Sequence, residues 1–499
     1  MSSLVPPARG SPVLGVVVGA LALMAAFAMR GEFRMPLNGD AAYHIDAARR
    51  MLDGAVLYRD IYDLNPPFIF WGSLPAAALG TDGRDAIAVF RALVIAVAIF
   101  AFAIGWVAVR KAPALWLGFT LMALVLPVGY FGQREYLIFV LLFPYVCVAA
   151  ARAEGDDPTT ASAMLAGGMA AAAILMKPTG MIVPVLIAAV NWHVRGARSV
   201  VGKEHLAVAA GLGAGVAAVL LAAPDYLRVI AEIQEPYRRF NLQGFRTLLT
   251  RDVHMWAIWL GLGATVMFGS RLPHRRRLLI LAVTTAGLGA SAVVQRKGFG
   301  YHYFPAVAFA VILMLEMLFS HPRTGPRALA RQIALVTMLV PVLYLFGAVA
   351  WRRAHGVFTA TRADQLVVED MIGRRPATVA VLSARISDAF PMVLENDHRF
   401  ILRYPLLWAA ALPVDFPGTG AIRRQYGEDL ARHFPAALVV RAPRISELSG
   451  GDVPVDYLQY LCHDDLARST LSQYRLSKRG DGFELYRTDA EGAAACVSS

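Results

Sequence analysis

Charged side chains and cysteines are scarce in this sequence, and each scarcity narrows the class of protein. Only 17% of the 499 residues are charged and 57% are hydrophobic, whereas roughly 45–50% of residues in soluble domains are apolar. This composition argues against a soluble enzyme. The three cysteines, Cys147, Cys462 and Cys496, have no spacing typical of a metal site or a redox motif. The last two could pair with each other if the tail lies outside the cytoplasm.

Long apolar runs recur from Pro12 to Ala350 and stop at Trp351. Because a bilayer core about 30 Å thick needs about 20 apolar residues per helix, we predict about eleven transmembrane helices. The predicted spans lie near residues 12–29, 86–109, 114–130, 136–151, 161–176, 179–193, 205–223, 253–270, 278–294, 303–319 and 333–350. The first could be a cleaved signal peptide, but the many later spans favour a retained helix.

Basic residues gather in the short loops on one side of these spans. The loops contain Arg110 with Lys111, Arg152, the residues 195–203, the residues 271–277 and the residues 323–331. Because cytoplasmic loops carry the excess of Lys and Arg, the N-terminus is expected inside and the tail outside. We therefore expect a multi-pass protein of a bacterial inner (plasma) membrane. This orientation also explains the net charge of +12 without a nucleic-acid partner.

The chain is expected to contain two domains. Residues 1–350 form an all-α polytopic membrane domain with a long first outer loop at 30–85, and residues 361–488 form a small soluble α/β domain. In this extracytoplasmic accessory domain, residues 377–382 and 436–440 are typical of buried strands and residues 455–472 of an amphipathic helix. Residues 474–486 predict a hairpin that turns at 480–482.

The first outer loop holds the most informative residues. After Asp40 the spacing is helical, with Ile45, Ala48 and Leu52 on one face. This pattern suits a helix along the membrane surface that is supported by i,i+4 ion pairs, Asp46 with Arg50 and Arg49 with Asp53. On spacing alone, Asp40 could simply be the N-cap of that helix.

The same loop resembles the GT-C superfamily of membrane glycosyltransferases, and most closely its bacterial protein O-mannosyltransferase and lipid A aminoarabinose transferase group. The resemblance covers about residues 10–350 in topology and is sharpest over residues 38–67. It rests on Asp-x-x-Tyr at 40–43, on Met-Leu-x-Gly-x-x-Leu-Tyr-Arg-Asp at 51–60 and on Pro-Pro at 66–67.

The resemblance implies that an acidic residue in the first outer loop is the catalytic base, and Asp40 matches that position. Relatives often carry Lys before the Pro-Pro pair, whereas this chain has Asn65. This departure weakens assignment to the aminoarabinose subgroup. The residues expected to support the base are Tyr43, Tyr58, Asp60, Asp63 and Asn65.

Two charged clusters interrupt apolar sequence at the outer ends of predicted spans. Arg134 and Glu135 are candidates for binding the donor phosphate, although an Arg–Glu pair that snorkels to the lipid interface is an equal alternative. Lys177, before Pro178, is a further candidate, with a solvated loop cation as the alternative. Charge at these positions is costly if it faces lipid.

The segment 295–305 combines adjacent cations, flexible glycines and aromatic rings. Arg296, Lys297, Tyr301 and His302 could supply donors and apolar walls for a phosphate head group, and the Lys-Gly-x-x-Tyr-His pattern resembles bacterial proteins with the same first loop. An ordinary aromatic belt at the interface is the alternative. The segment 235–240 could be a lid, although a solvated amphipathic helix is more usual.

The expected function is inverting transfer of a sugar from a polyprenyl-phosphate-linked donor to an envelope lipid, glycan or protein at the outer face. A lipid-linked donor fits the absence of a glycine-rich nucleotide fingerprint after any predicted strand. No cofactor is expected, and the sequence neither supports nor excludes a divalent metal. The alternatives are an O-antigen-type polymerase or ligase, a noncatalytic envelope assembly protein, and a transporter or flippase of lipid-linked sugars. Transporters usually place charges at the bilayer midplane, and four of the predicted spans contain none.

Overall fold

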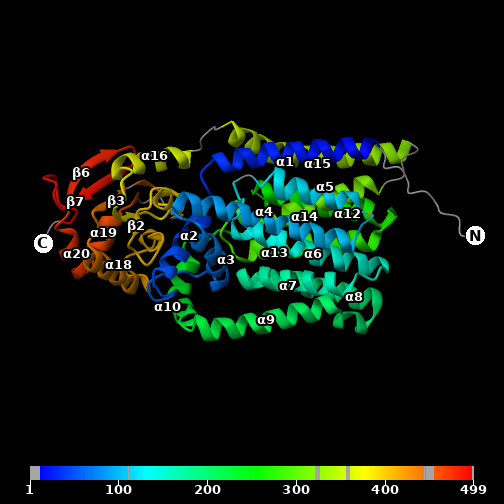
Figure 1. Ribbon diagram of the computed structural model, residues 1–499, viewed down its shortest axis with the longest axis horizontal. Helices are drawn as coiled ribbons and strands as arrows, with labels where there is room; N and C mark the ends of the chain where they lie inside the picture. The colour runs from blue at the N-terminus through cyan, green and yellow to red at the C-terminus, as the bar shows by residue number, and fades with distance from the viewer. Residues whose placement is uncertain are drawn as a thin grey trace, which may run out of the picture.

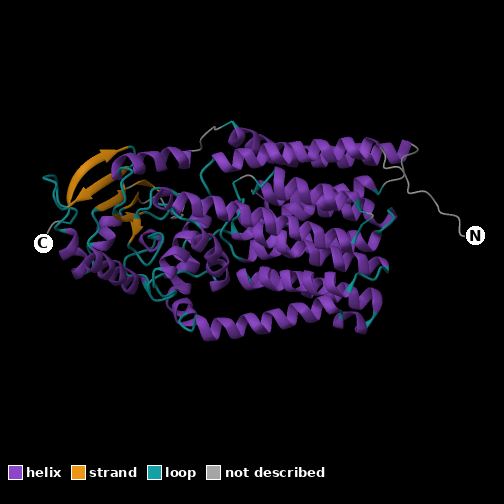
Figure 2. Ribbon diagram, in the orientation of Figure 1, coloured by secondary structure: helices purple, strands orange, loops and turns teal. Residues whose placement is uncertain are grey.

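A computed structural model describes residues 12–110, 112–127, 129–250, 252–320, 326–355, 360–442, 444–445 and 454–496. A long bundle of helices forms most of the molecule, and a smaller domain with a β-sheet packs against one end of the bundle (Figure 1). The sheet lies wholly within this end domain (Figure 2). The predicted combination of a helical membrane domain with a C-terminal α/β domain is confirmed.

Every predicted span coincides with a helix of the bundle. These helices are α1 (Pro12–Arg34), α4 (Gly83–Ala108), α5 (Pro113–Thr120) with a π turn (Leu121–Val125), α6 (Arg134–Glu154), α7 (Thr160–Met176), α8 (Ile182–Arg195), α9 (Lys203–Ala222), α12 (Val253–Phe268), α13 (Arg275–Val294), α14 (Gly300–Phe319) and α15 (Pro326–Ala354). Within the described residues, six of them are long and apolar enough to cross a membrane: α4, α6, α9, α13, α14 and α15.

Helices α6 and α14 form the centre of the bundle and are almost wholly buried, whereas α9 and α15 expose most of their length. In Figure 1, α15 lies beside α1 along one side and α9 lies along the opposite side. Exposed leucine and valine side chains on α9, such as Leu220 and Val216, suit contact with lipid. Small residues allow close crossings inside, since a Cβ at Gly118 would lie 2.6 Å from the side chain of Ile312.

Four shorter helices lie at the end of the bundle that meets the α/β domain: α2 (Gly39–Leu52), α3 (Pro67–Leu79), α10 (Tyr226–Arg239) and α11 (Phe245–Thr250). The predicted helix after Asp40 is therefore present as α2, and the amphipathic segment near 235–240 forms α10. Helix α2 packs on α3 and on the C-terminal domain, and the sequence from Gly39 to Ala48 is mostly buried. It is thus enclosed by protein rather than laid on a membrane surface.

Two local predictions for α2 are wrong. The N-cap is Asn38, whose side-chain oxygen accepts the backbone N–H of Asp40 at 3.0 Å. Asp40 therefore belongs to the first turn and does not cap the helix. Arg49 does not pair along its own helix but binds Asp397 of the C-terminal domain at 2.7 Å, and Arg50 donates to backbone carbonyls. Both contacts need distant chain segments, which spacing within one helix could not reveal.

The C-terminal domain has a five-stranded sheet in the order β2-β1-β3-β7-β6, in which β2, β1 and β3 are parallel and β7 and β6 form an antiparallel hairpin. Its strands are β1 (Thr378–Leu382), β2 (Arg399–Phe400), β3 (Ala437–Arg441), β6 (Arg475–Gly480) and β7 (Phe483–Arg487), with a separate pair β4 (Arg444–Ile445) and β5 (Pro454–Val455). Its helices are α16 (Ala360–Ile372), α17 (Met392–Glu395), α18 (Thr419–His433), α19 (Tyr457–Leu461) and α20 (Asp465–Leu471).

The predicted strands and hairpin of this domain are present, but the predicted single helix at 455–472 is wrong. It is divided into α19 and α20, because Asp464 starts a new helix by accepting the backbone N–H of Ala467. Cys462, at the break, forms a disulfide with Cys496. The pairing that the sequence left open is thus the one in the structure.

Candidate active site

A cavity of about 800 Å³ lies where the bundle, the first outer loop, α10 and the C-terminal domain meet. This volume lies within the range of about 300–1,000 Å³ common for small-molecule sites. Its acidic, basic, histidine and amide lining residues are Asp40, His44, Asp63, Asn65, Gln133, Arg134, Glu135, Lys177, Gln234, Arg238, Gln295, Lys297, His302 and Arg385. Aromatic and apolar side chains, among them Tyr237, Tyr301 and Trp408, complete the wall.

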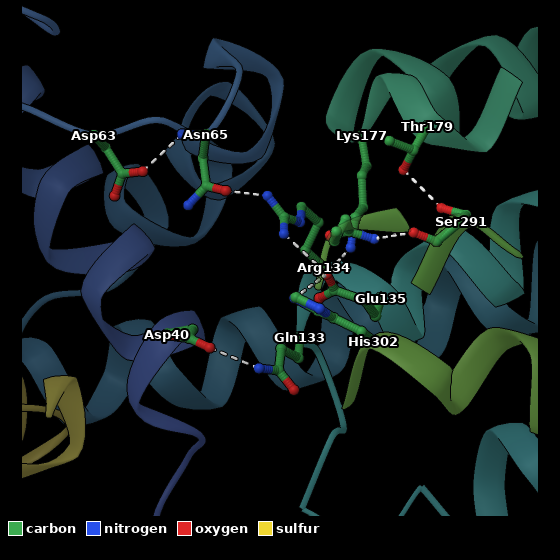
Figure 3. Close-up of polar contacts among 11 residues, drawn as sticks. Asp40, Asp63, Asn65, Gln133, Arg134, Glu135, Lys177, Thr179, Ser291 and His302 are labelled. Carbon is green, nitrogen blue, oxygen red and sulfur yellow. Dashed lines mark hydrogen bonds and ion pairs between the residues drawn. The ribbon is translucent and has the colours of Figure 1, made fainter. Parts of the chain in front are cut away.

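Asp40 reaches the cavity from the first turn of α2. Its Oδ2 accepts a hydrogen bond of 2.6 Å from Nε2 of Gln133, just before α6 (Figure 3). Burial raises the pKa of Asp40, and the bond from Gln133 opposes this shift. A carboxylate with a raised pKa is a stronger base, and one oriented by an amide is held ready for a proton.

Glu135, two residues after Gln133, joins two cations in the lining of the cavity. Its Oε1 lies 2.6 Å from Nζ of Lys177 and 2.9 Å from Nη2 of Arg134, and Figure 3 shows the three side chains converging. The same oxygen lies 3.8 Å from Nε2 of His302. Arg134 also donates to the side-chain oxygen of Asn65.

The burial of this group excludes both simpler interpretations. The side chains of Glu135, Lys177 and Arg134 are only 2%, 10% and 16% exposed. The Arg–Glu pair therefore does not snorkel to the lipid interface, and Lys177 is not a solvated loop cation. The guanidinium of Arg134 and the ammonium of Lys177 share the single carboxylate of Glu135. This sharing leaves a local excess of positive charge facing the cavity. Such an excess favours binding of an anion such as a phosphate.

Burial also lowers the proton affinity of Lys177, which lies just after α7. It lowers the pKa of Lys177 to about 8, although Glu135 raises that pKa in opposition. Lys177 therefore loses its charge at a lower pH than an ordinary lysine.

The structure separates the four residues expected from the segment 295–305. Tyr301 and His302 line the cavity at the start of α14. Lys297 also borders it, but its Nζ donates to the carbonyls of Tyr237 at 2.7 Å and Phe240 at 2.5 Å. Burial lowers the pKa of Lys297 to about 8. Its charge is thus directed at the C-terminal end of α10, where cations are favoured.

Arg296 does not belong to the described lining of the cavity. Its Nε donates to the carbonyl of Gln243 at 3.0 Å, and its guanidinium lies 4.7 Å from the centre of the Phe245 ring. It therefore ties the segment after α10 to the start of α14. The expectation that Arg296 contacts the donor phosphate does not agree with this placement.

The residues expected to support the base also divide into two groups. Tyr43, Asp63 and Asn65 line the cavity, and burial raises the pKa of Asp63 to about 6. Tyr58 lies behind this wall and donates through its hydroxyl to the carbonyl of Asn65 at 2.6 Å. Asp60 is exposed and accepts the backbone N–H of Val56, so it stabilises the turn rather than the cavity.

Several residues that line the cavity are not among the site residues predicted from the sequence. His44 follows Asp40 by one helical turn, so the i,i+4 spacing could have identified it, and burial lowers its pKa to about 3. The wall contributed by the C-terminal domain, including Arg385, Tyr404 and Trp408, had no signal in the sequence. Within the described residues, no group of three or more His, Cys, Asp or Glu side chains is placed to hold a metal ion.

Comparison with known proteins gives a match of fold. No family model and no curated protein matches the sequence. The crystal structure of ArnT from Cupriavidus metallidurans bound to undecaprenyl phosphate is similar, with a TM-score of 0.63, 14% identity and coverage of 98% of this chain and 100% of that chain. The apo structure of the same protein gives 0.62, 15%, 96% and 98%. The chain therefore has the ArnT fold, which confirms the predicted resemblance at the level of structure and identifies an integral membrane protein.

Proposed function

We propose that this protein is an inverting glycosyltransferase that moves one sugar from a polyprenyl-phosphate-linked donor to a hydroxyl of an envelope lipid, glycan or protein. The observation that carries the proposal is the pairing, in one cavity, of a carboxylate positioned as a base with a buried cation cluster. The similar ArnT structure binds undecaprenyl phosphate, which supports a polyprenyl-phosphate donor. The fold alone would not fix the function.

Asp40 and the cation cluster have different roles in the proposed reaction. Asp40 takes the proton of the acceptor hydroxyl, whose oxygen attacks the anomeric carbon from the side opposite the phosphate. The bond between that carbon and the phosphate oxygen breaks, and the phosphate leaves with the electron pair. One displacement of this kind inverts the anomeric configuration. Lys177 and Arg134 stabilise the charge that develops on the departing phosphate.

The contacts of Glu135 explain how the cation cluster persists without a donor. Its carboxylate holds Lys177 and Arg134 at 2.6 Å and 2.9 Å, so the two cations are positioned before the donor arrives. Preorganised charges are effective because they need little reorganisation during the reaction. Gln133 does the same for Asp40 through its 2.6 Å hydrogen bond.

We further propose that the cavity faces the outer side of a bacterial inner membrane, with the N-terminus in the cytoplasm. The disulfide between Cys462 and Cys496 supports this orientation, because disulfides persist in oxidising compartments. The basic loops after α4 and α8, which contain Arg110 and Arg198, support it as well, since such loops favour the cytoplasmic side. Nucleotide sugars are not available outside the cytoplasm, which is consistent with a lipid-linked donor.

The proposal is tested with the full-length protein in liposomes, supplied with polyprenyl-monophosphate sugars and an envelope fraction from a strain that lacks the gene. Mass spectrometry of the products identifies both sugar and acceptor. Transfer from an oligosaccharide diphosphate alone would instead favour an O-antigen-type polymerase or ligase. Movement of donor across the bilayer without any glycosidic product would favour a flippase.

The residue test replaces Asp40 by Asn. Since Asn38 caps α2, Asp40→Asn removes the base without removing a cap, and we expect transfer to slow by about 10²–10⁴-fold. Asp46→Asn is the matched control, because Asp46 lies on the same helix, is buried and has a pKa raised to about 6, but lies outside the cavity lining. Equal activity in the two variants would move the base assignment away from Asp40.

A further inference from the structure

A second cavity of about 630 Å³ lies between the first outer loop and the C-terminal domain. It is bounded by residues from 50 to 60 on one side and from 399 to 403 and 429 to 433 on the other, and we refer to it as the seam groove. Its lining residues are all different from those of the larger cavity. The buried side chains of Phe400 and Ile401 contribute its floor.

The seam groove is rich in arginine, with five arginines and three aspartates in its lining. Two of the arginines already have carboxylate partners. Arg403 binds Asp429 through Nε at 3.0 Å and Nη2 at 2.8 Å, and Arg59 binds Asp225 at 2.6 Å. Arg403 also binds Glu428 at 3.0 Å. These pairs fix the walls of the groove, whose own lining has five arginines against three aspartates.

The other three arginines have no carboxylate partner among the described residues. Arg50 donates to the backbone carbonyls of Leu402 at 3.2 Å and Asp60 at 2.9 Å, which orient its guanidinium without cancelling its charge. Arg399 and Arg432 are exposed to the groove, and their side chains make no hydrogen bond or ion pair with any other described residue. No side-chain donor of Arg399 or Arg432 is therefore taken up by another residue within the described part of the chain.

These three arginines line the seam groove together with the imidazole of His433. Burial is the main cause that lowers the pKa of His433, and the negative charge of Asp429 opposes this shift. The positive charges of Arg399, Arg432 and Arg50 lower the pKa further. All three positive charges therefore act on the same part of the groove. Like charges gathered in this way repel, and an anion between them relieves the repulsion.

We propose that the seam groove binds a phosphate-type oxyanion through Arg399 and Arg432, with Arg50 as a third, pre-oriented donor. The planar guanidinium fork matches two phosphate oxygens, which makes arginine the usual residue for such anions. The groove is larger than one phosphate ion, so the oxyanion belongs either to a membrane lipid or glycolipid head group or to free phosphate. This site goes beyond the transfer reaction, because its binding does not require Asp40 or the cation cluster.

A bound oxyanion would have a structural consequence. Arg50 belongs to the helix that carries Asp40, whereas Arg399 and Arg432 belong to β2 and α18 of the C-terminal domain. An anion held by all three therefore braces the domain against α2. The ion pair between Arg49 and Asp397, at 2.7 Å, crosses the same junction and would be reinforced.

The test measures thermal unfolding of the full-length protein through the fluorescence of its eight tryptophans. In one arm, the protein in neutral detergent is titrated with inorganic phosphate against chloride at constant ionic strength. In the other arm, it is placed in phosphatidylcholine nanodiscs with or without phosphatidic acid. A ligand that binds the folded state raises the unfolding temperature in a saturable manner.

The variants separate the seam groove from the larger cavity. Arg399→Gln/Arg432→Gln should raise the ligand concentration needed for stabilisation by about tenfold or more. Arg424→Gln is the matched control, since Arg424 is an exposed arginine of the same α18 outside both cavities. Lys177→Met should leave the groove response intact, because it alters only the larger cavity.

The two arms identify the source of the anion. A response to inorganic phosphate that the double variant weakens assigns free phosphate as a ligand, and one confined to phosphatidic acid assigns a lipid head group. The proposal is wrong if the double variant responds like Arg424→Gln in both arms, or if neither arm gives a saturable shift. Failure of sugar transfer would not affect this result, because the measurement requires no donor or acceptor.

Discussion

Replacing the members of the Glu135 cluster one at a time tests whether the cavity is organised for a phosphate. Glu135→Gln keeps the shape of the side chain but leaves Lys177 and Arg134 buried together without a counter-charge. Removing one partner of a buried ion pair typically costs about 3–5 kcal/mol. Lys177→Met should cost less, about 1–3 kcal/mol, because Glu135 keeps its contact with Arg134 at 2.9 Å. The double variant Glu135→Gln/Lys177→Met should be more stable than Glu135→Gln alone, since it removes the repulsion between Lys177 and Arg134.

A phosphate ligand should stabilise Glu135→Gln more than Lys177→Met, which is the reverse of their order of stability without ligand. Undecaprenyl phosphate brings a negative charge to the cations, so it should raise the unfolding temperature of Glu135→Gln more than that of the unchanged protein. Lys177→Met should respond least, since it has lost one of the two cations that hold the phosphate. Its transfer rate or donor affinity should fall by about tenfold to a hundredfold.

The assay is thermal unfolding in detergent with and without the lipid phosphate, followed by transfer kinetics in liposomes. Equal stabilisation of all three proteins by undecaprenyl phosphate would refute the assignment of this cluster to the donor phosphate. So would a Lys177→Met variant less stable than Glu135→Gln, because the argument from shared charge requires the opposite order. Asp46→Asn again serves as the control for a change in a buried charge outside the cavity.

Three further predictions concern pH, the orientation of Asp40 and the disulfide. The kcat/KM of transfer should rise with pH as Asp40 ionises, with a midpoint above the ordinary carboxylate pKa of about 3.9 because burial raises its pKa. It should fall again through about pH 8 as Lys177, whose pKa is lowered to about 8, loses its proton; a rate that is flat from about pH 6 to about pH 10 would contradict the role of Lys177. Gln133→Met should lower kcat with little change in the donor KM and should shift the acidic limb of the profile upward, because the amide no longer stabilises the carboxylate. Cys462→Ser should lower the unfolding temperature under oxidising conditions by roughly the effect of one disulfide, about 2–4 kcal/mol in stability, and Cys496→Ser should match it; a loss in only one variant would indicate that the two cysteines do not act as a pair.

Features encoded locally could be predicted from the sequence, because their signals lie within a few residues. The apolar spans, the helix after Asp40 and the hairpin that turns at 480–482 depend on hydrophobic length, helical spacing or turn residues. Each of these is present in the structure. The N-cap of α2 lies two residues before the candidate Asp40, and spacing did not separate the two because Asn and Asp are both good caps.

Contacts between distant segments could not be predicted from spacing. Lys177 meets Glu135 across 42 residues and Arg49 meets Asp397 across 348, and no periodicity connects such positions. The same limit explains Lys297, whose sequence neighbours suggested a phosphate ligand. In the fold, the C-terminal end of α10 lies beside Lys297, and the ammonium of Lys297 donates hydrogen bonds to backbone carbonyls there. A cation near aromatic residues has the same local pattern in both roles, and only the tertiary arrangement distinguishes them.

Asn65 is a neutral residue that meets a cation from a distant part of the sequence. In the sequence, Asn65 before the Pro-Pro pair weakened assignment to the aminoarabinose subgroup, for which the resemblance implies Lys at this place. Arg134, from the start of α6, donates to the side chain of Asn65 and so brings its guanidinium to that part of the cavity. A lysine at 65 would place a third cation beside Arg134 and Lys177, which already share Glu135, at a cost in buried charge. The neutral amide instead accepts a hydrogen bond from Arg134, while its backbone N–H binds Asp63 at 2.7 Å. The site therefore has a cation beside the Pro-Pro segment that comes from α6, and the residue at position 65 alone does not reveal it.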